Sequence, residues 1–74
     1  MSTRSKVDMK AIGARIKMLR GSMVQEELAD YLDITQGHLS KIEHGKIAPS
    51  LETLLSLSIR FHKSIDWIVR GDGH

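Results

Sequence analysis

The sequence contains no cysteine, and its 74 residues include only one proline, one tryptophan, one tyrosine and one phenylalanine. Without cysteine the chain can form neither a disulfide nor a cysteine-ligated zinc site, which are the usual supports of small domains. It also lacks a long apolar run, so we expect no membrane span and no secretory signal, and hence a cytoplasmic protein. A chain of this length forms one domain with a small core, and oligomerisation is the remaining way to stabilise it.

The sequence also lacks the usual patterns of an enzyme. Its four histidines, His38, His44, His62 and His74, do not have the spacing of metal ligands, and there is no glycine-rich phosphate loop. The 11 basic residues nearly cancel the 9 acidic ones, leaving a net charge of +2 that identifies no partner by itself. We therefore expect no catalytic activity, no cofactor, no metal and no small-molecule ligand.

Apolar residues recur at helical spacing in five segments, and no stretch alternates with a period of two as a strand would. The five helices are expected to end at Arg20, near Leu32, before Gly45, at Phe61 and at Val69. The helix over residues 51–61 is the most apolar, and we expect it to be the central packing element. Residues 1–7 are polar and basic, which predicts a flexible arm before a folded domain over residues 8–74.

Polar residues that can accept a hydrogen bond from a free amide stand where each helix should begin. The expected caps are Asp8, Ser22, Thr35, Ser50 and Ser64. Ser22 and the glutamine three residues later have the form of a capping box, in which each side chain binds the other residue's amide.

The second and third helices are separated by only two or three residues, which is typical of two helices that cross steeply at a tight turn. Such a crossing needs apolar inner faces and a small residue at the elbow. The residues that fit these needs are Leu28, Ala29, Leu32, Ile34, Leu39 and Ile42. Periodicity alone also fits an ordinary helical hairpin.

The segment VQEELADYLDITQGHLSKIEHGKIAPS resembles the helix-turn-helix of the phage repressor and Cro-like transcriptional regulators, and IGARIKMLR and LETLLSLSIRFHKSIDWIVRGDG resemble its flanking helices. The resemblance implies an all-α, five-helix, lambda-repressor-like domain. It further implies a small homodimeric regulator that binds a near-palindromic double-stranded DNA operator, most simply repressing by occlusion. The alternative is an antitoxin-like protein-interaction module with the same fold.

The resemblance also assigns roles to individual residues. It places Gln36, His38 and Lys41 on one exposed face of the recognition helix as base-reading residues; the alternative for each is a solvated surface side chain. It assigns phosphate contacts to Gln25, Thr35, Ser40 and Lys46, of which Gln25 could equally be only a cap. Arg20 and Glu43 match an ion pair that we expect to be exposed, and so to orient the helices more than to stabilise them.

The sequence departs from the family's usual pattern at several positions. Asp33 occupies the turn position usually held by glycine, and Val24 the position of the usual cap. Gly37 lies inside the recognition helix, where it costs roughly 1 kcal/mol relative to alanine and removes a side chain that relatives use on bases. Lys63 replaces a commonly apolar residue.

The dimer interface is expected in the C-terminal part of the chain. The candidates are Ile59, Ile65 and Trp67, although Trp67 equally fits a position in the core of one subunit. If the chain is a dimer, its two recognition helices should lie about 34 Å apart, which is the spacing of successive major grooves.

Overall fold

A computed structural model describes residues 7–72 of the chain, which form five helices and, within that range, no strand. The helices are α1 (Met9–Arg20), α2 (Gln25–Leu32), α3 (Gln36–Glu43), α4 (Leu51–Phe61) and α5 (Ile65–Arg70). The expected all-α, five-helix fold is confirmed. The expected arm, residues 1–7, lies outside the described residues except for Val7. None of the described helices combines the length and the apolar character needed to cross a membrane.

Four of the five expected caps are confirmed by side-chain hydrogen bonds to a free amide in the first turn of a helix. Asp8 accepts from the Ala11 N–H at 3.1 Å, and the caps Thr35, Ser50 and Ser64 do the same for their helices.

The predicted capping box at Ser22 is wrong, because Ser22 does not cap α2. Helix α2 begins after Val24, which occupies the cap position but makes no side-chain cap bond and is 62% exposed. Gln25 is therefore the first residue of α2 and not its third, and its amide binds an acidic side chain instead.

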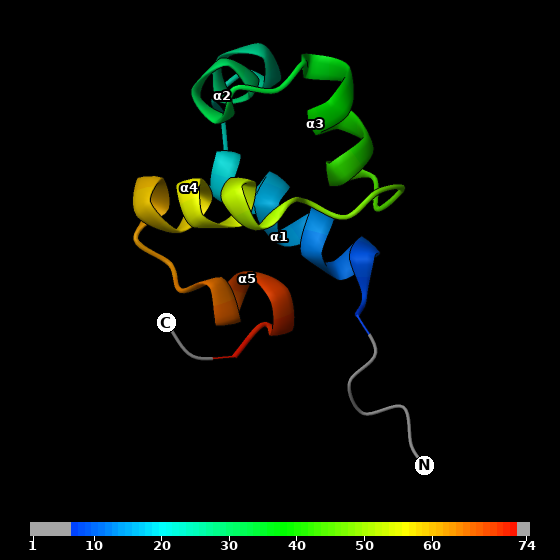
Figure 1. The fold of residues 1–74 in the computed structure, drawn as a ribbon, viewed down its shortest axis with the longest axis vertical. Coiled ribbons are helices and arrows are strands. Elements are labelled where there is room, and N and C mark those ends of the chain that lie inside the picture. Colours follow the sequence, from blue (N-terminus) through cyan, green and yellow to red (C-terminus); the bar gives the residue numbers. More distant parts are fainter. Residues whose placement is uncertain (1–6, 73–74) are drawn as a thin grey trace.

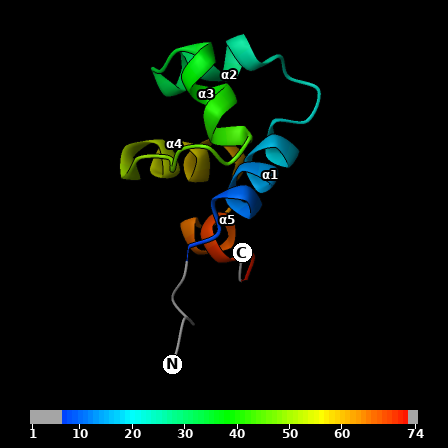
Figure 2. The same ribbon diagram turned by 90° about the vertical axis from the view of Figure 1, so that its right-hand side faces the viewer.

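The five helices occupy the two ends and the middle of the domain. Helices α2 and α3 lie together at one end, α1 and α4 run across the middle, and α5 lies at the opposite end (Figures 1 and 2). One continuous apolar core connects these parts. Its buried members are Ile12, Ile16, Leu28, Ala29, Leu32, Leu39, Ile42, Leu57 and Ile68.

Helix α4 is not the central packing element that its composition predicts. Only Thr53 and Leu57 are buried in it, whereas Leu51, Leu55 and Ile59 are 73%, 52% and 63% exposed. The last three are spaced by four residues and therefore share one helix face. The α4 sequence is apolar on two faces, and only one of them packs against the core; α1 instead lies between α3 and α5.

The turn between α2 and α3 has the backbone conformation expected from its sequence. Asp33 lies in the left-handed region, with φ 60° and ψ 42°, which aspartate tolerates better than most residues. This conformation reverses the chain at once, and the Ile34 N–H then donates to the Ala29 carbonyl at 3.0 Å. Ala29, the small residue expected at this elbow, is 1% exposed.

Gly13 allows α1 and α3 to approach each other closely. A Cβ atom at this position would lie 2.4 Å from the Ile42 carbonyl oxygen and 2.6 Å from that of Glu43. These atoms belong to the backbone and cannot rotate away. Because Gly13 has no side chain, the end of α3 can pack directly against α1.

Arg15 joins α1 to the end of α5. Its Nε donates to the Ile68 carbonyl and its Nη2 to the Val69 carbonyl, both at 2.8 Å. The last carbonyls of a helix have no partner within the helix, so this guanidinium satisfies two groups that would otherwise need water.

We predict that Gly13→Ala lowers the free energy of unfolding by about 1–3 kcal/mol, because its methyl group must push α1 and α3 apart. The matched control is Gly37→Ala, which adds the same methyl where no atom lies within 4 Å and should raise stability by up to about 1 kcal/mol. Urea unfolding of the two variants measures both effects. Equal effects of the same sign would contradict this role of Gly13.

Candidate nucleic-acid interface

Helix α3 has one buried face and one exposed face. Leu39, Ile42 and Glu43 are buried, and successive residues are rotated by about 100° around a helix axis. The direction opposite the buried residues therefore falls on Gly37, Lys41 and His44, all of which are exposed. These residues form the centre of the exposed face.

Gln36, His38 and Lys41 are all exposed, as expected from the sequence, but they are spread across the full width of the exposed face of α3. Gln36 and His38 lie roughly 160° apart around the axis, since two residues are separated by about 200°. They form opposite borders of the exposed surface, with Lys41 between them. The three side chains can therefore meet one ligand only if it covers the whole outer face of α3.

Arg20 and Glu43 form an ion pair between the end of α1 and the end of α3. Nε of Arg20 donates to Oε2 at 2.7 Å and Nη2 to Oε1 at 2.9 Å, while Nη1 donates to the Met23 carbonyl at 2.7 Å. The expectation of an exposed pair is wrong, because the side chains are only 14% and 2% exposed. Gly13 brings the end of α3 so close to α1 that water is excluded from the carboxylate.

Burial and hydrogen bonding act on Glu43 in opposite directions. Burial disfavours the charged carboxylate and would raise its pKa, but the hydrogen bonds from Arg20 and Gln25 outweigh this, so the pKa lies below its ordinary value of 4.5. The hydrogen bond to Glu43 in turn raises the pKa of Arg20. Both groups are therefore charged at neutral pH.

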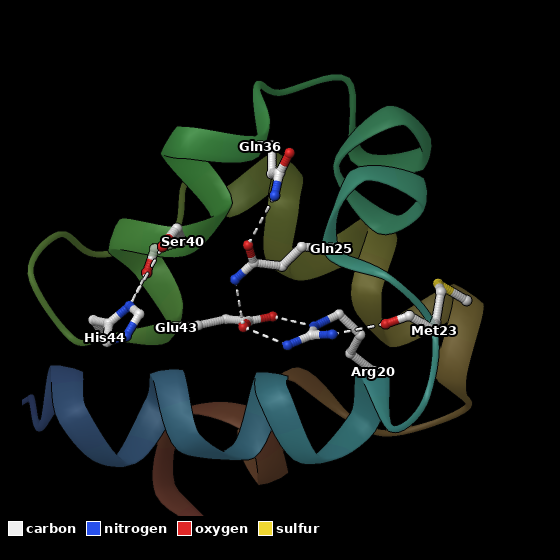
Figure 3. Close-up of polar contacts among 7 residues, drawn as sticks. All are labelled: Arg20, Met23, Gln25, Gln36, Ser40, Glu43 and His44. Atoms are coloured by element: carbon white, nitrogen blue, oxygen red, sulfur yellow. Dashed lines mark hydrogen bonds and ion pairs between the residues drawn. The ribbon is translucent and has the colours of Figure 1, made fainter.

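A chain of hydrogen bonds extends from this pair to the first residue of α3 (Figure 3). The Gln25 Nε2 donates to Oε1 of Glu43 at 2.9 Å, and the Gln36 Nε2 donates to Oε1 of Gln25 at 3.4 Å. An ionised carboxylate only accepts, which fixes the orientation of the Gln25 amide. The Gln25 oxygen must then face Gln36, and so the carbonyl oxygen of Gln36 and one of its N–H groups remain free.

Four of the residues near the end of α3 line one open depression, namely Ser40, Lys41, His44 and Lys46. Nδ1 of His44 lies 2.7 Å from the Ser40 carbonyl oxygen. Because a carbonyl oxygen only accepts, this nitrogen carries the hydrogen, and Nε2 is left for other partners. The depression thus brings together two lysines, a histidine and a hydroxyl.

The other expected phosphate contacts lie at the starts of the two helices. The Thr35 oxygen is used as a cap, but its hydroxyl hydrogen is still available to donate. Gln25 is half-buried, and both ends of its amide bind protein side chains, which leaves one N–H for another acceptor.

The burial of Glu43 also decides the charge of the exposed face. It is the sole acid between Thr35 and Ser50, and its carboxylate is 2% exposed and paired with Arg20. The outer surface of α3 and the following loop therefore carries lysines and histidines without an exposed carboxylate of its own.

The expected dimer residues are not equally accessible. Ile59 is 63% exposed. Ile65 and Trp67 are less accessible, because both are half-buried and Trp67 packs against the core. The Lys63 ammonium lies 4.7 Å from the centre of the Trp67 ring, so this unusual lysine covers the indole. Ile59 is continuous with Leu51 and Leu55 on α4.

Sequence reasoning missed several of these features. The pattern gave no signal for His44 in the centre of the exposed face or for the bond between Gln25 and Glu43, because both depend on how α3 is rotated. It also missed Leu51 and Leu55 as surface residues. Their four-residue spacing with Ile59, separate from the stripe that contains Leu57, was a signal that could have found them.

Comparison with known proteins identifies similar domains. A family model described as "Helix-turn-helix" matches residues 16–68. A curated relative, the SPbeta prophage-derived uncharacterized HTH-type transcriptional regulator YonR of Bacillus subtilis, is 39% identical over 61 residues. The match covers 80% of this chain and 56% of the relative, so the chain spans about half the length of that protein.

Two solved structures have a similar fold. The P22 c2 repressor in complex with synthetic operator 9T matches with a TM-score of 0.76 and 28% identity, over 82% of this chain and 96% of the chain in that structure. The clp gene regulator ClgR of Corynebacterium glutamicum matches with a TM-score of 0.72 and 27% identity, over 81% of this chain and 66% of that protein.

We predict that Arg20→Met lowers the free energy of unfolding by about 3–5 kcal/mol at neutral pH, because it leaves the Glu43 carboxylate buried without its cation. The double variant Arg20→Met, Glu43→Leu should lose much less than the sum of the two single variants. Urea unfolding of all four proteins gives this coupling energy. Additivity within about 0.5 kcal/mol would show that the pair does not act as a unit.

The same interaction has a distinctive pH dependence. A carboxylate whose pKa is lower in the folded state stabilises the fold above its ordinary pKa of 4.5, and this stability is lost as the pH falls through the lower folded value. The free energy of unfolding of Glu43→Gln should therefore fall less steeply below about pH 4.5 than that of the wild type. Parallel pH profiles for the two proteins would exclude Glu43 as the cause.

Proposed function

The chain belongs to the helix-turn-helix family of phage repressor and Cro-like transcriptional regulators, and from that membership we propose that it binds a double-stranded DNA operator as a homodimer and represses transcription by occlusion. The family is one of DNA-binding regulators and not of enzymes. The hydrogen-bonded pair Gln25 and Gln36, on the outer side of α2 and α3, is the observation that carries the DNA-binding part of the proposal.

Gln36 is suited to read adenine. Its inner N–H is used by Gln25, and its carbonyl oxygen and other N–H remain available side by side. Adenine presents a donor at N6 and an acceptor at N7 in the major groove, which a glutamine amide can bind with two hydrogen bonds. Because the amide orientation is set by Glu43 through Gln25, Gln36 is prepared for this base before DNA binds.

The basic depression at the end of α3 is suited to the DNA backbone. Lys41, His44, Ser40 and Lys46 converge there, and phosphates attract such groups irrespective of sequence. Lys41 also lies near the bases if α3 enters the groove, and His38 borders the opposite side. Thr35 and Gln25 supply further donors to phosphate at the helix starts.

The exposed apolar residues of α4 support a dimer. We define the α4 stripe as Leu51, Leu55 and Ile59, which together form the longest regular row of exposed apolar side chains in the described chain. Such rows in a small protein commonly mark a protein interface. A second copy of this chain fits the two-fold operators that such regulators read. The proposed interface also includes Ile65 and Trp67 of α5, which are half-buried in one copy.

We predict that Gln36→Ala loses sequence preference at one base pair in each half of the operator, with a cost of about 1–3 kcal/mol there. Selection of bound sites from random duplex DNA by the wild type and the variant measures this directly. An unchanged preference would refute base reading by Gln36.

The matched control is Lys46→Ala, which removes a cation from the basic depression. It should weaken binding to all sequences alike and reduce the salt dependence, since log affinity falls by about 0.9 per log unit of salt for each phosphate neutralised. A salt-insensitive association of the wild type with DNA would contradict the proposed mechanism.

We predict that Ile59→Ser shifts the chain toward the monomer without destabilising the subunit, because Ile59 is 63% exposed and packs little within one copy. Sedimentation equilibrium at micromolar protein, together with thermal unfolding, separates the two effects. The control Met18→Ser removes a similarly exposed apolar residue, 66% exposed, from α1 instead of α4. A wild type that stays monomeric at all concentrations would refute the dimer.

A further inference from the structure

Neither the packing nor the backbone conformation of the subunit requires a glycine at position 37. Gly13 cannot hold a Cβ, and Gly21, Gly45 and Gly71 have positive φ angles that side chains avoid. At Gly37 an added Cβ would meet no atom within 4 Å, and the backbone there is ordinary helix. Among the glycines that the structure describes, Gly37 alone could become alanine at no steric cost to the fold.

The position of Gly37 indicates what the missing side chain makes room for. It is the second residue of α3 and lies at the centre of the exposed face, opposite buried Leu39 and Ile42. The first residues of a recognition helix are those that meet base edges when the helix lies in the major groove. The centre of the outer face then lies deepest, between Gln36 on one side and Lys41 on the other.

We propose that Gly37 determines specificity by letting the α3 backbone touch a base edge on the floor of the major groove. This inference rests on the proposed DNA-binding function. The methyl group of an alanine would hold α3 away from the bases, and Gln36 could then no longer reach adenine with both hydrogen bonds. A base edge is favoured over a phosphate as the contact, because Gly37 lies in the first turn of α3, the part of a recognition helix that meets base edges, whereas the depression proposed to bind phosphates lies at the other end of the helix.

The proposal predicts that stability and recognition respond to Gly37→Ala in opposite directions. The melting temperature Tm should rise, by up to about 8 °C, as expected for removing a helical glycine from a domain of this size. Affinity for the operator selected by the wild type should fall at least about tenfold, the scale of one mismatched contact. Affinity for random duplex DNA at the same salt should change by less than about twofold, because phosphate contacts are retained.

The experiment selects sites from random duplex DNA with the wild type and with Gly37→Ala, and then measures both proteins on both sets of sites. If Gly37→Ala prefers a different sequence at a few adjacent base pairs only, the proposal is supported. The control Lys46→Ala should lower affinity for all duplexes without changing the preferred sequence. Equal operator affinity of Gly37→Ala and wild type overturns it. If the wild type itself enriches no sequence, the proposed function fails first, which is distinguishable from failure at Gly37 alone.

Discussion

The buried ion pair between Arg20 and Glu43 is the interaction on which the rest of the structure depends. It joins the end of the first helix to the end of the recognition helix, and its carboxylate sets the direction of the hydrogen bonds that pass through Gln25 to Gln36. The pair is possible only because Gly13 lets the two helices approach. One polar contact thus fixes helix packing, side-chain orientation and the charge of the exposed face.

Most of the fold could be predicted from the sequence because its signals are local. The caps Asp8, Thr35, Ser50 and Ser64, the left-handed Asp33 and the apolar seam around Ala29 each follow from neighbouring residues. The capping box failed for a reason outside that local window. Gln25 finds a charged acceptor in Glu43, 18 residues away, and a hydrogen bond to a charged group is stronger than one to a backbone amide.

The candidate site was predicted residue by residue but not as an arrangement. Resemblance singles out Gln36, His38 and Lys41 in the sequence. Which way α3 is rotated about its axis then decides that Gln36 and His38 lie at opposite borders of its exposed face. Burial of Glu43 and the exposure of the α4 stripe also depend on which of several possible helix faces packs inward. Periodicity locates such faces but cannot choose between two apolar ones, as α4 demonstrates.

The contact of Arg15 with the end of α5 has a consequence for how the domain folds. It closes a loop of more than fifty residues, between α1 and the Ile68 and Val69 carbonyls. Helices of eight and six residues, such as α2, α3 and α5, are too short to persist alone in water. Helices α2 and α3 therefore cannot be excised as an autonomous unit, because they depend on packing against the rest of the domain, and a domain of this size typically folds in a single cooperative step.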